Sequence, residues 1–116
     1  MARVASIVGD LMLASRVRTS LEQAGHEVSQ APALGPGVLR AVDLIVVDLD
    51  TVPPEELADA GVPVIGFYRH TDVEIKRRAD EAGLAIAVPR SRMVRELPEL
   101  VNKHLGETRR PPQAAD

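Results

Sequence analysis

Two acids follow the most apolar run in the chain. Asp48 and Asp50, separated by one residue, end the aliphatic run 44–47. Four aliphatic residues, three of them β-branched, predict a strand buried on both faces of a parallel sheet. Ligands and chemistry in such sheets are found at the carboxyl ends of the strands. Asp48 and Asp50 are therefore candidate site residues, although acids that merely end a strand before a loop would give the same pattern.

Two further charged residues are expected near these acids. Asp10 follows the first apolar run, where it suits the N-cap of a helix and could also share a metal ion with Asp48. Arg90 follows the last predicted strand. It could point at Asp48 and supply positive charge, or it could be a solvated residue at the start of the last helix. Asp50 fits best as a loop acid.

Three other motifs favour structural roles. His26, His70 and His104 lie in separate segments with no metal-ligand spacing. Residues 35–37, Gly-Pro-Gly, follow the second predicted strand and lack the dinucleotide-binding pattern, so they predict a turn. The basic run 76–78 has acidic neighbours on both sides, which favours a solvated helix face.

Composition excludes several classes of protein. The chain has 116 residues, a net charge of -3, no cysteine, and only one Phe and one Tyr. There is no basic surface for nucleic acid, no thiolate nucleophile or disulfide, and no run of about 18 apolar residues for a membrane span. We expect a soluble cytoplasmic protein that binds neither nucleic acid nor membrane.

Hydrophobic periodicity predicts an alternating α/β domain over residues 1–106, followed by a disordered polar tail at 107–116. Pro98 is expected only in a first helical turn, so the last helix should become regular near Leu97. The predicted strands are 3–8, 26–30, 43–48, 62–67 and 84–88. The predicted helices are 11–24, a barely one-turn segment at 38–42, a short helix from 52 that ends at Gly61, a helix at 73–82 capped by Thr71 or Asp72, and 92–105.

The order of these signals resembles the receiver domain of bacterial two-component response regulators. The resemblance rests on the strand that ends in Asp48, on residues 21–28 as a helix that runs into a strand, and on the segments 62–65 and 79–83. It implies a flavodoxin-like fold with a five-stranded parallel sheet of order 2-1-3-4-5. The second and third helices are shorter than is usual in that family.

The resemblance also assigns functional positions, beginning with the acids. Asp48 matches the family's phosphoacceptor aspartate. The acidic pair that holds Mg²⁺ in receivers matches Val8 and Gly9, so both carboxylates are missing and Asp10 stands one residue further on. Because phosphoryl transfer to a carboxylate needs a metal ion to neutralise the transferring oxygens, Mg²⁺ binding by Asp10 and Asp48 is expected to be weak or absent.

The remaining two positions are also altered. The Ser or Thr that relays phosphorylation matches Tyr68, whose phenol is too far from its backbone to copy the movement of a small hydroxyl. The family's lysine matches Arg90 by an ungapped count from Gly83, or Val88 if Pro89 is aligned with the family's proline.

We therefore expect a pseudo-receiver: a stand-alone, non-enzymatic signalling domain that acts by protein contact, independently of phosphorylation. It would bind a protein partner or form a homodimer, through the first helix or through the surface made by residues 73–105. One alternative is a response regulator phosphorylated on Asp48. Another is a small-ligand-binding or enzymatic domain that uses Asp10, Asp48 and Arg90 and needs a pocket deep enough to bury its ligand.

Overall fold

The computed structural model describes residues 2–35, 41–69 and 73–105, and its centre is a parallel sheet. The strands lie in the order β2-β1-β3-β4-β5. This is the order that the resemblance implied, and the fold prediction is confirmed. The five strands are β1 (Arg3–Ile7), β2 (Glu27–Ala31), β3 (Leu44–Asp48), β4 (Val64–Tyr68) and β5 (Ile86–Pro89).

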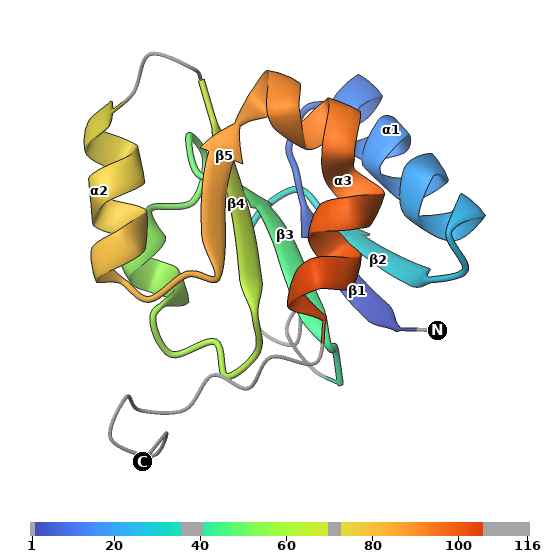
Figure 1. Ribbon diagram of the computed structural model, residues 1–116, viewed down its shortest axis with the longest axis horizontal. Coiled ribbons are helices and arrows are strands. Elements are labelled where there is room, and N and C mark those ends of the chain that lie inside the picture. The colour runs from blue at the N-terminus through green and yellow to red at the C-terminus, as the bar shows by residue number, and fades with distance from the viewer. Residues whose placement is uncertain (1, 36–40, 70–72, 106–116) are drawn as a thin grey trace.

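Helices cover both faces of the sheet, as Figure 1 shows. On one side are α1 (Leu11–Gln23) and α3 (Arg90–His104); on the other are η1 (Pro54–Leu57) and α2 (Val73–Glu81). Side chains alternate along a strand, so β3 contributes to two cores. Leu44 and Val46 pack with α1 and α3, whereas Ile45 and Val47 pack with η1 and α2. All four are completely buried, as the apolar run predicted.

Local signals set the limits of α1. The Oδ1 atom of Asp10 accepts a hydrogen bond from the Leu13 N–H at 3.0 Å, which confirms the predicted N-cap. Leu13, Val17 and Leu21 form the buried face of the helix. Gly25 follows the helix with a φ of 93°, a conformation that costs glycine little because it has no Cβ.

The connections on the η1 side are short. The third predicted helix is a four-residue 3₁₀ turn, Pro54–Leu57. Most of the expected segment 38–42, the expected cap Thr71 or Asp72, Gly106 and the predicted tail 107–116 lie outside the described residues. Within the described ranges, no helix is both long and apolar enough to cross a membrane.

The prediction for the last helix was wrong at its start. Instead of beginning at Arg92 and becoming regular near Leu97, α3 begins at Arg90, directly after β5, and contains Pro98 in its interior. Pro98 has no N–H to donate to the Val94 carbonyl, and its ring crowds that carbonyl. The helix continues because side chains on both sides of the proline are buried against the sheet: Met93, Leu97, Leu100 and Val101. Tertiary packing therefore overrides the local preference.

Candidate functional site

Asp48 lies where the sequence placed it, at the carboxyl end of the central strand. It is the last residue of β3 and is opposite Phe67 of β4. Its side chain is partly buried, and its Oδ1 accepts the Asp50 N–H at 2.9 Å. Its own carbonyl accepts the N–H groups of Thr51 and Val52 at 3.1 and 3.0 Å. The turn therefore holds the Asp48 carboxylate in a fixed orientation at the edge of the sheet.

The pKa of Asp48 is raised above its ordinary value, first because partial burial disfavours the charged carboxylate. The Asp50 N–H opposes this shift by stabilising the anion, and the Asp50 charge adds to it. The positive charges of Arg90 and Arg69 lower the pKa by smaller amounts. Asp48 is thus a partly desolvated carboxylate with two arginines within electrostatic range.

Asp10 and Arg90, far apart in sequence, form an ion pair at the end of the sheet where Asp48 lies. Arg90 is the first residue of α3, and its guanidinium lies 3.3 Å from Asp10 Oδ2. The other carboxylate oxygen of Asp10 caps α1 through the Leu13 N–H. That hydrogen bond is the main cause of a lowered Asp10 pKa, to which the Arg90 contact also contributes. Arg90 matches neither of the two alternatives fully: it is ion-paired to Asp10, and its charge only slightly lowers the Asp48 pKa.

The residues at the expected Mg²⁺ position do not fit a magnesium site. Val8 is buried in the core beneath α1 and α3, and Gly9 has no side chain. Both carboxylate oxygens of Asp10 already have partners, in Leu13 and Arg90, and one oxygen of Asp48 is bound to the Asp50 amide. Mg²⁺ requires near-octahedral oxygen coordination, usually with carboxylates among its ligands. Val8 and Gly9 therefore contribute no carboxylate, and Asp10 would have to give up its Arg90 ion pair to serve as a ligand.

Tyr68 and Asp50 lie at the same end of the sheet but contribute differently. Tyr68 ends β4, and its side chain is buried with the core residues beneath η1 and α2. Asp50 is exposed, and it contacts Asp48 through its backbone N–H rather than through its carboxylate. The structure thus pairs Arg90 with Asp10 and lets the Arg90 charge act on Asp48, while the Tyr68 ring is part of the core.

One pair that positions Asp48 was missed at the sequence level. Leu49 is buried over Gly66 of β4, and a Cβ at Gly66 would lie only 2.5 Å from the nearest Leu49 methyl carbon. Leu49 therefore anchors the residue next to Asp48 in a space that only glycine leaves open. A glycine in the middle of an apolar strand is the sequence signal for such a close approach.

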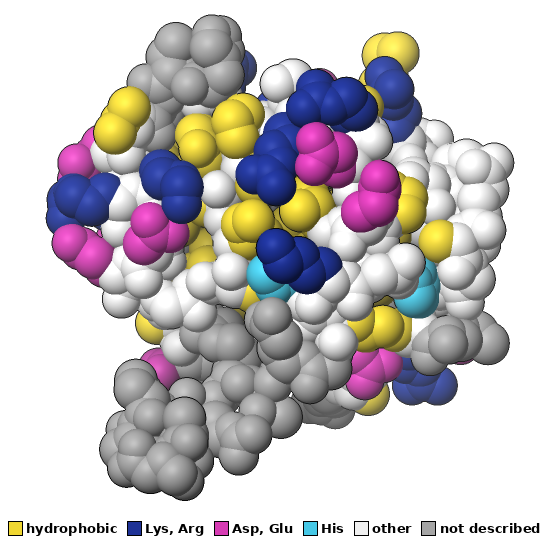
Figure 2. All heavy atoms as spheres, in the orientation of Figure 1, with side chains coloured by type: hydrophobic (Ala, Val, Ile, Leu, Met, Phe, Trp, Pro, Cys, Tyr) yellow, Lys and Arg dark blue, Asp and Glu magenta, His cyan; other side chains and the backbone are white. Residues whose placement is uncertain are grey.

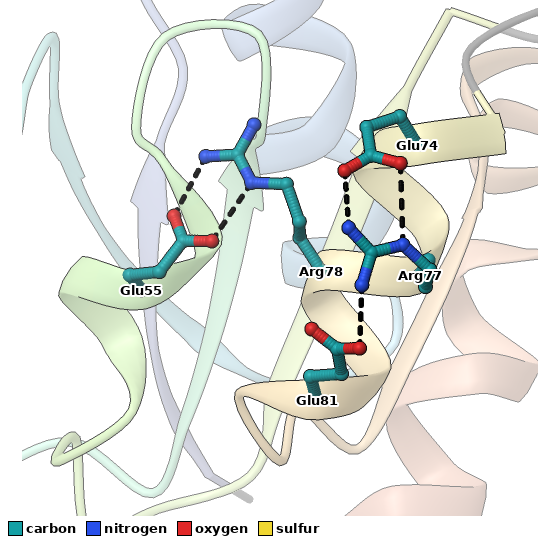
Figure 3. A network of polar contacts seen from close by, with 5 residues as sticks. All are labelled: Glu55, Glu74, Arg77, Arg78 and Glu81. Carbon is teal, nitrogen blue, oxygen red and sulfur yellow. Dashed lines mark hydrogen bonds and ion pairs between the residues drawn. The ribbon is translucent and has the colours of Figure 1, made fainter.

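The basic run 76–78 is paired with carboxylates, as Figure 3 shows for two of its members. Arg77 contacts Glu74 and Glu81 on its own helix. Arg78 binds Glu55 of η1 through two hydrogen bonds of 2.6 and 2.7 Å. This contact is the main reason that the pKa of Glu55 falls to about 2. Lys76 pairs with Asp80. The run thus belongs to an ion-paired helix surface, as predicted, and Arg78 also ties α2 to η1.

The two described histidines are both buried. The Nδ1 atom of His26 accepts a hydrogen bond from the Ala2 N–H at 3.2 Å, so His26 holds the start of β1. His104 lies at the end of α3 in the core. His70 is outside the described residues. Among the residues that are described, no three His, Cys, Asp or Glu side chains form a group that could hold a metal ion.

The face seen in Figure 2 is a second candidate surface. Hydrophobic side chains are visible between α2 and α3, over the edge strand β5, with charged side chains around them. This face corresponds to the surface 73–105 that was expected to bind a partner or a second copy.

No protein-family model matches the sequence, and no curated protein matches it either. Solved structures do match, and they are receiver domains and response regulators. HP1043, an orphan response regulator of H. pylori, is 18% identical, with a TM-score of 0.77 over 90% of this chain and 96% of its own. A response regulator from Thermotoga maritima is 18% identical, with a TM-score of 0.77 over 92% and 99%.

The receiver domain of the Francisella response regulator 1452 is 21% identical, with a TM-score of 0.74 over 89% of this chain and 95% of its own. At these identities the likeness concerns the fold, and the chain has the fold of response-regulator receiver domains.

Proposed function

We propose that this chain is a receiver-like signalling domain that acts by protein contact and does not depend on phosphorylation of Asp48. The fold supports a role in two-component signalling. The observation that carries the proposal is the Arg90–Asp10 ion pair, whose guanidinium also acts electrostatically on Asp48. A built-in guanidinium supplies positive charge beside the phosphoacceptor position, where receivers place a metal ion.

The acidic pair that receivers use for Mg²⁺ is replaced here by a buried valine and a glycine. Phosphoryl transfer would then proceed without the ion that neutralises and aligns the transferring oxygens. A guanidinium can neutralise charge, but it cannot coordinate a phosphoryl group and two carboxylates as a metal ion does. In this proposal the domain stays in one state, has no catalytic activity, and is recognised by its surface.

The alternative function, phosphorylation on Asp48, makes a different prediction about magnesium. A receiver that binds Mg²⁺ with a dissociation constant near ~1 mM gains about 1.4 kcal/mol of stability at ~10 mM metal. For a domain of this size, that raises the melting temperature by roughly 5–10 °C. We expect this chain to have a dissociation constant of at least ~10 mM, hence a gain of about 0.4 kcal/mol and a shift of at most roughly 3 °C.

The experiment combines thermal melts in Mg²⁺ with intact-mass measurement after treatment with acetyl phosphate and Mg²⁺. We expect a small thermal shift and no mass change. A phosphoryl adduct that Asp48→Asn abolishes would refute the proposal and identify a functional response regulator.

A gain-of-function variant provides the positive control. A Cβ at Gly9 would lie 3.6 Å from the Pro32 carbonyl oxygen, an ordinary contact distance, so a side chain can start there without a backbone clash. Gly9→Asp combined with Arg90→Ala adds one carboxylate and releases another. This double variant should show a clearly larger Mg²⁺-dependent shift than the parent chain.

A further inference from the structure

The strand β2 forms one edge of the sheet and is open to solvent on its outer side. In Figure 1, β2 and β5 lie at opposite edges. Glu27, Ser29 and Gln30 of β2 are exposed, whereas Val28 and Ala31 are half-buried. An edge strand presents a row of backbone N–H and C=O groups that can pair with another chain. The outer side of β2 is therefore a candidate pairing surface.

The hydrogen bonds between β2 and β1 show which backbone groups of β2 are free. The Glu27 N–H donates to the Ala2 carbonyl of the neighbouring chain segment at 2.8 Å. Because backbone groups alternate between the two sides of a strand, every second residue from Glu27 faces β1. The N–H and C=O groups of Val28 and Gln30 therefore point away from the sheet. Within the residues that the structure describes, β2 pairs with β1 alone.

The free row of backbone groups is short and has a clear limit at each end. At one end, the His26 N–H already donates to the Leu21 carbonyl at 3.0 Å. At the other end, Pro32 has no N–H to donate. The Gln30 side chain is held away from the row, because its amide donates to the Ala14 carbonyl of α1 at 2.6 Å. The row available for pairing in both directions is thus two residues long.

A second copy of β2 matches this row when it runs antiparallel to the first. With the two-fold axis through Ser29, Val28 of each copy lies opposite Gln30 of the other, and the two residues of each pair exchange N–H···O=C hydrogen bonds. An axis through Val28 would instead place Gln30 opposite His26, whose N–H is already used. An axis through Gln30 would place Val28 opposite Pro32, which has no N–H. Only the register centred on Ser29 satisfies the row of both copies.

The side chains are also compatible with this register. Glu27 is the only charged residue of β2, and it lies opposite Ala31 of the second copy, so no like charges oppose each other. Edge strands usually avoid such pairing through a lysine, a proline or a bulge. The strand β2 contains neither of these residues, and its register with β1 runs without a bulge. Charge and backbone geometry therefore both favour a second copy.

We propose that β2 pairs with β2 of a second copy of this chain, so that two five-stranded sheets become one continuous sheet. The pairing is made by β2 rather than by either surface that the sequence suggested for a homodimer. Few residues take part, so the dimer is weak and forms at high protein concentration. The inference goes beyond the proposed function. Because β5 is the opposite edge, the dimer would present the surface 73–105 of both copies to partners.

The experiment measures self-association of the full chain by sedimentation, from about 20 μM to about 1 mM, without Mg²⁺ or acetyl phosphate. At the two-fold axis, the two Ser29 Cα atoms would be about 4.5 Å apart. Ser29→Lys and Ser29→Glu therefore each place like charges side by side, and each variant alone should be monomeric. Mixed in equal amounts at low salt, the two variants should form a heterodimer. The Ser29 side chain is exposed, so both variants should fold.

A second pair of variants tests the backbone directly. Gln30→Pro and Gln30→Ala both lose the side-chain contact with Ala14, but only the proline variant loses the outward N–H. Proline is tolerated on an edge strand where the N–H faces solvent. We expect Gln30→Pro to abolish the dimer, and Gln30→Ala to keep its dissociation constant within about threefold of the parent value. Amide spectra of each variant show whether it is folded.

Several outcomes would overturn the inference. A chain that stays monomeric at about 1 mM would do so, as would a dimer that Ser29→Lys leaves intact. Amide shifts on dilution that are confined to α2 and β5 would place the contact at the other edge. A monomeric chain that binds an extended peptide of alternating threonine and valine along β2 would make the occupant a strand of a partner. A phosphoryl adduct on Asp48 refutes the proposed function and leaves the sedimentation result unchanged, whereas a monomeric chain refutes only the dimer.

Discussion

At the scale of single residues, Asp48 is the part of the site with the least favourable environment. It is partly buried, and that burial is the main reason its pKa is raised. A carboxylate held at a site under these conditions usually reduces stability, because a neutral residue would be desolvated at lower cost.

Replacing Asp48 by asparagine should therefore stabilise the domain at neutral pH, by about 0.5–1 kcal/mol. Asparagine keeps a carbonyl oxygen that can accept the Asp50 N–H, so the turn is retained. The folded parent chain binds the Asp48 proton more tightly than the unfolded chain does. The stability of the parent chain therefore falls as pH rises from the unfolded Asp48 pKa, near 4, through the raised folded pKa. The advantage of the variant should consequently vanish below about pH 4.

Urea unfolding at pH 7 and at about pH 3.5 measures this difference. Asp59→Asn, at an exposed position, is the matched control and should leave stability nearly unchanged at both values of pH. If Asp48→Asn destabilised the chain at pH 7, the prediction would be wrong. The Asp48 carboxylate would then make a favourable contact other than those named above.

At the scale of elements, the contact between Leu49 and Gly66 determines where the Asp48 turn lies. Leu49 continues the ladder from β3 to β4 through its N–H, which donates to the Phe67 carbonyl at 2.9 Å. Its side chain fills the space above Gly66 in the middle of β4. The strand order alone would not fix the position of the Asp48 turn. The turn also requires a glycine at position 66 on the neighbouring strand, β4.

Gly66→Ala should destabilise the domain by about 1–3 kcal/mol, since the new methyl group overlaps the Leu49 side chain. Leu49→Ala should cost about 2–5 kcal/mol, because it empties a buried site. The double variant should be more stable than Leu49→Ala alone, since the alanine methyl group refills part of that space.

Chemical denaturation of the four chains in a double-mutant cycle measures the coupling. Additive effects would show that the two residues do not compete for the same space. A Gly66→Ala variant as stable as the parent would show that Leu49 moves aside without cost.

At the scale of the whole molecule, the two helical layers have different characters. The layer of η1 and α2 is joined by the Glu55–Arg78 pair and covered with ion pairs that neutralise its basic residues. The layer of α1 and α3 carries an excess of basic residues, and a groove that contains Arg16 runs between the two helices.

Deletion of residues 107–116 should leave the melting temperature unchanged within experimental error. The segment is polar, contains two adjacent prolines and has no large apolar side chain to anchor it on the domain. Thermal melts of the full and shortened chains make the comparison. A loss of several degrees would show that the segment docks on the domain and that the predicted boundary at residue 106 is wrong.

The sequence by itself determined the sheet, the Asp10 cap and the position of Asp48. Each of these follows from signals within a short stretch of chain, such as the aliphatic run before Asp48 or an acid that precedes an amphipathic helix. The strand order came from the family resemblance rather than from periodicity. The start of α3 was misjudged because the preference of Pro98 is local, whereas burial of Met93, Leu97 and Leu100 against the sheet is not.

Only the tertiary structure decided how the site is completed. The sequence left Arg90 with two possible roles, and the packing of α3 against α1 brings its guanidinium to Asp10, 80 residues earlier in the chain. The fit of Leu49 over Gly66 and the groove between α1 and α3 likewise join residues from separate elements. Such contacts depend on how helices and strands pack in three dimensions, and residue spacing within one segment carries no information about them.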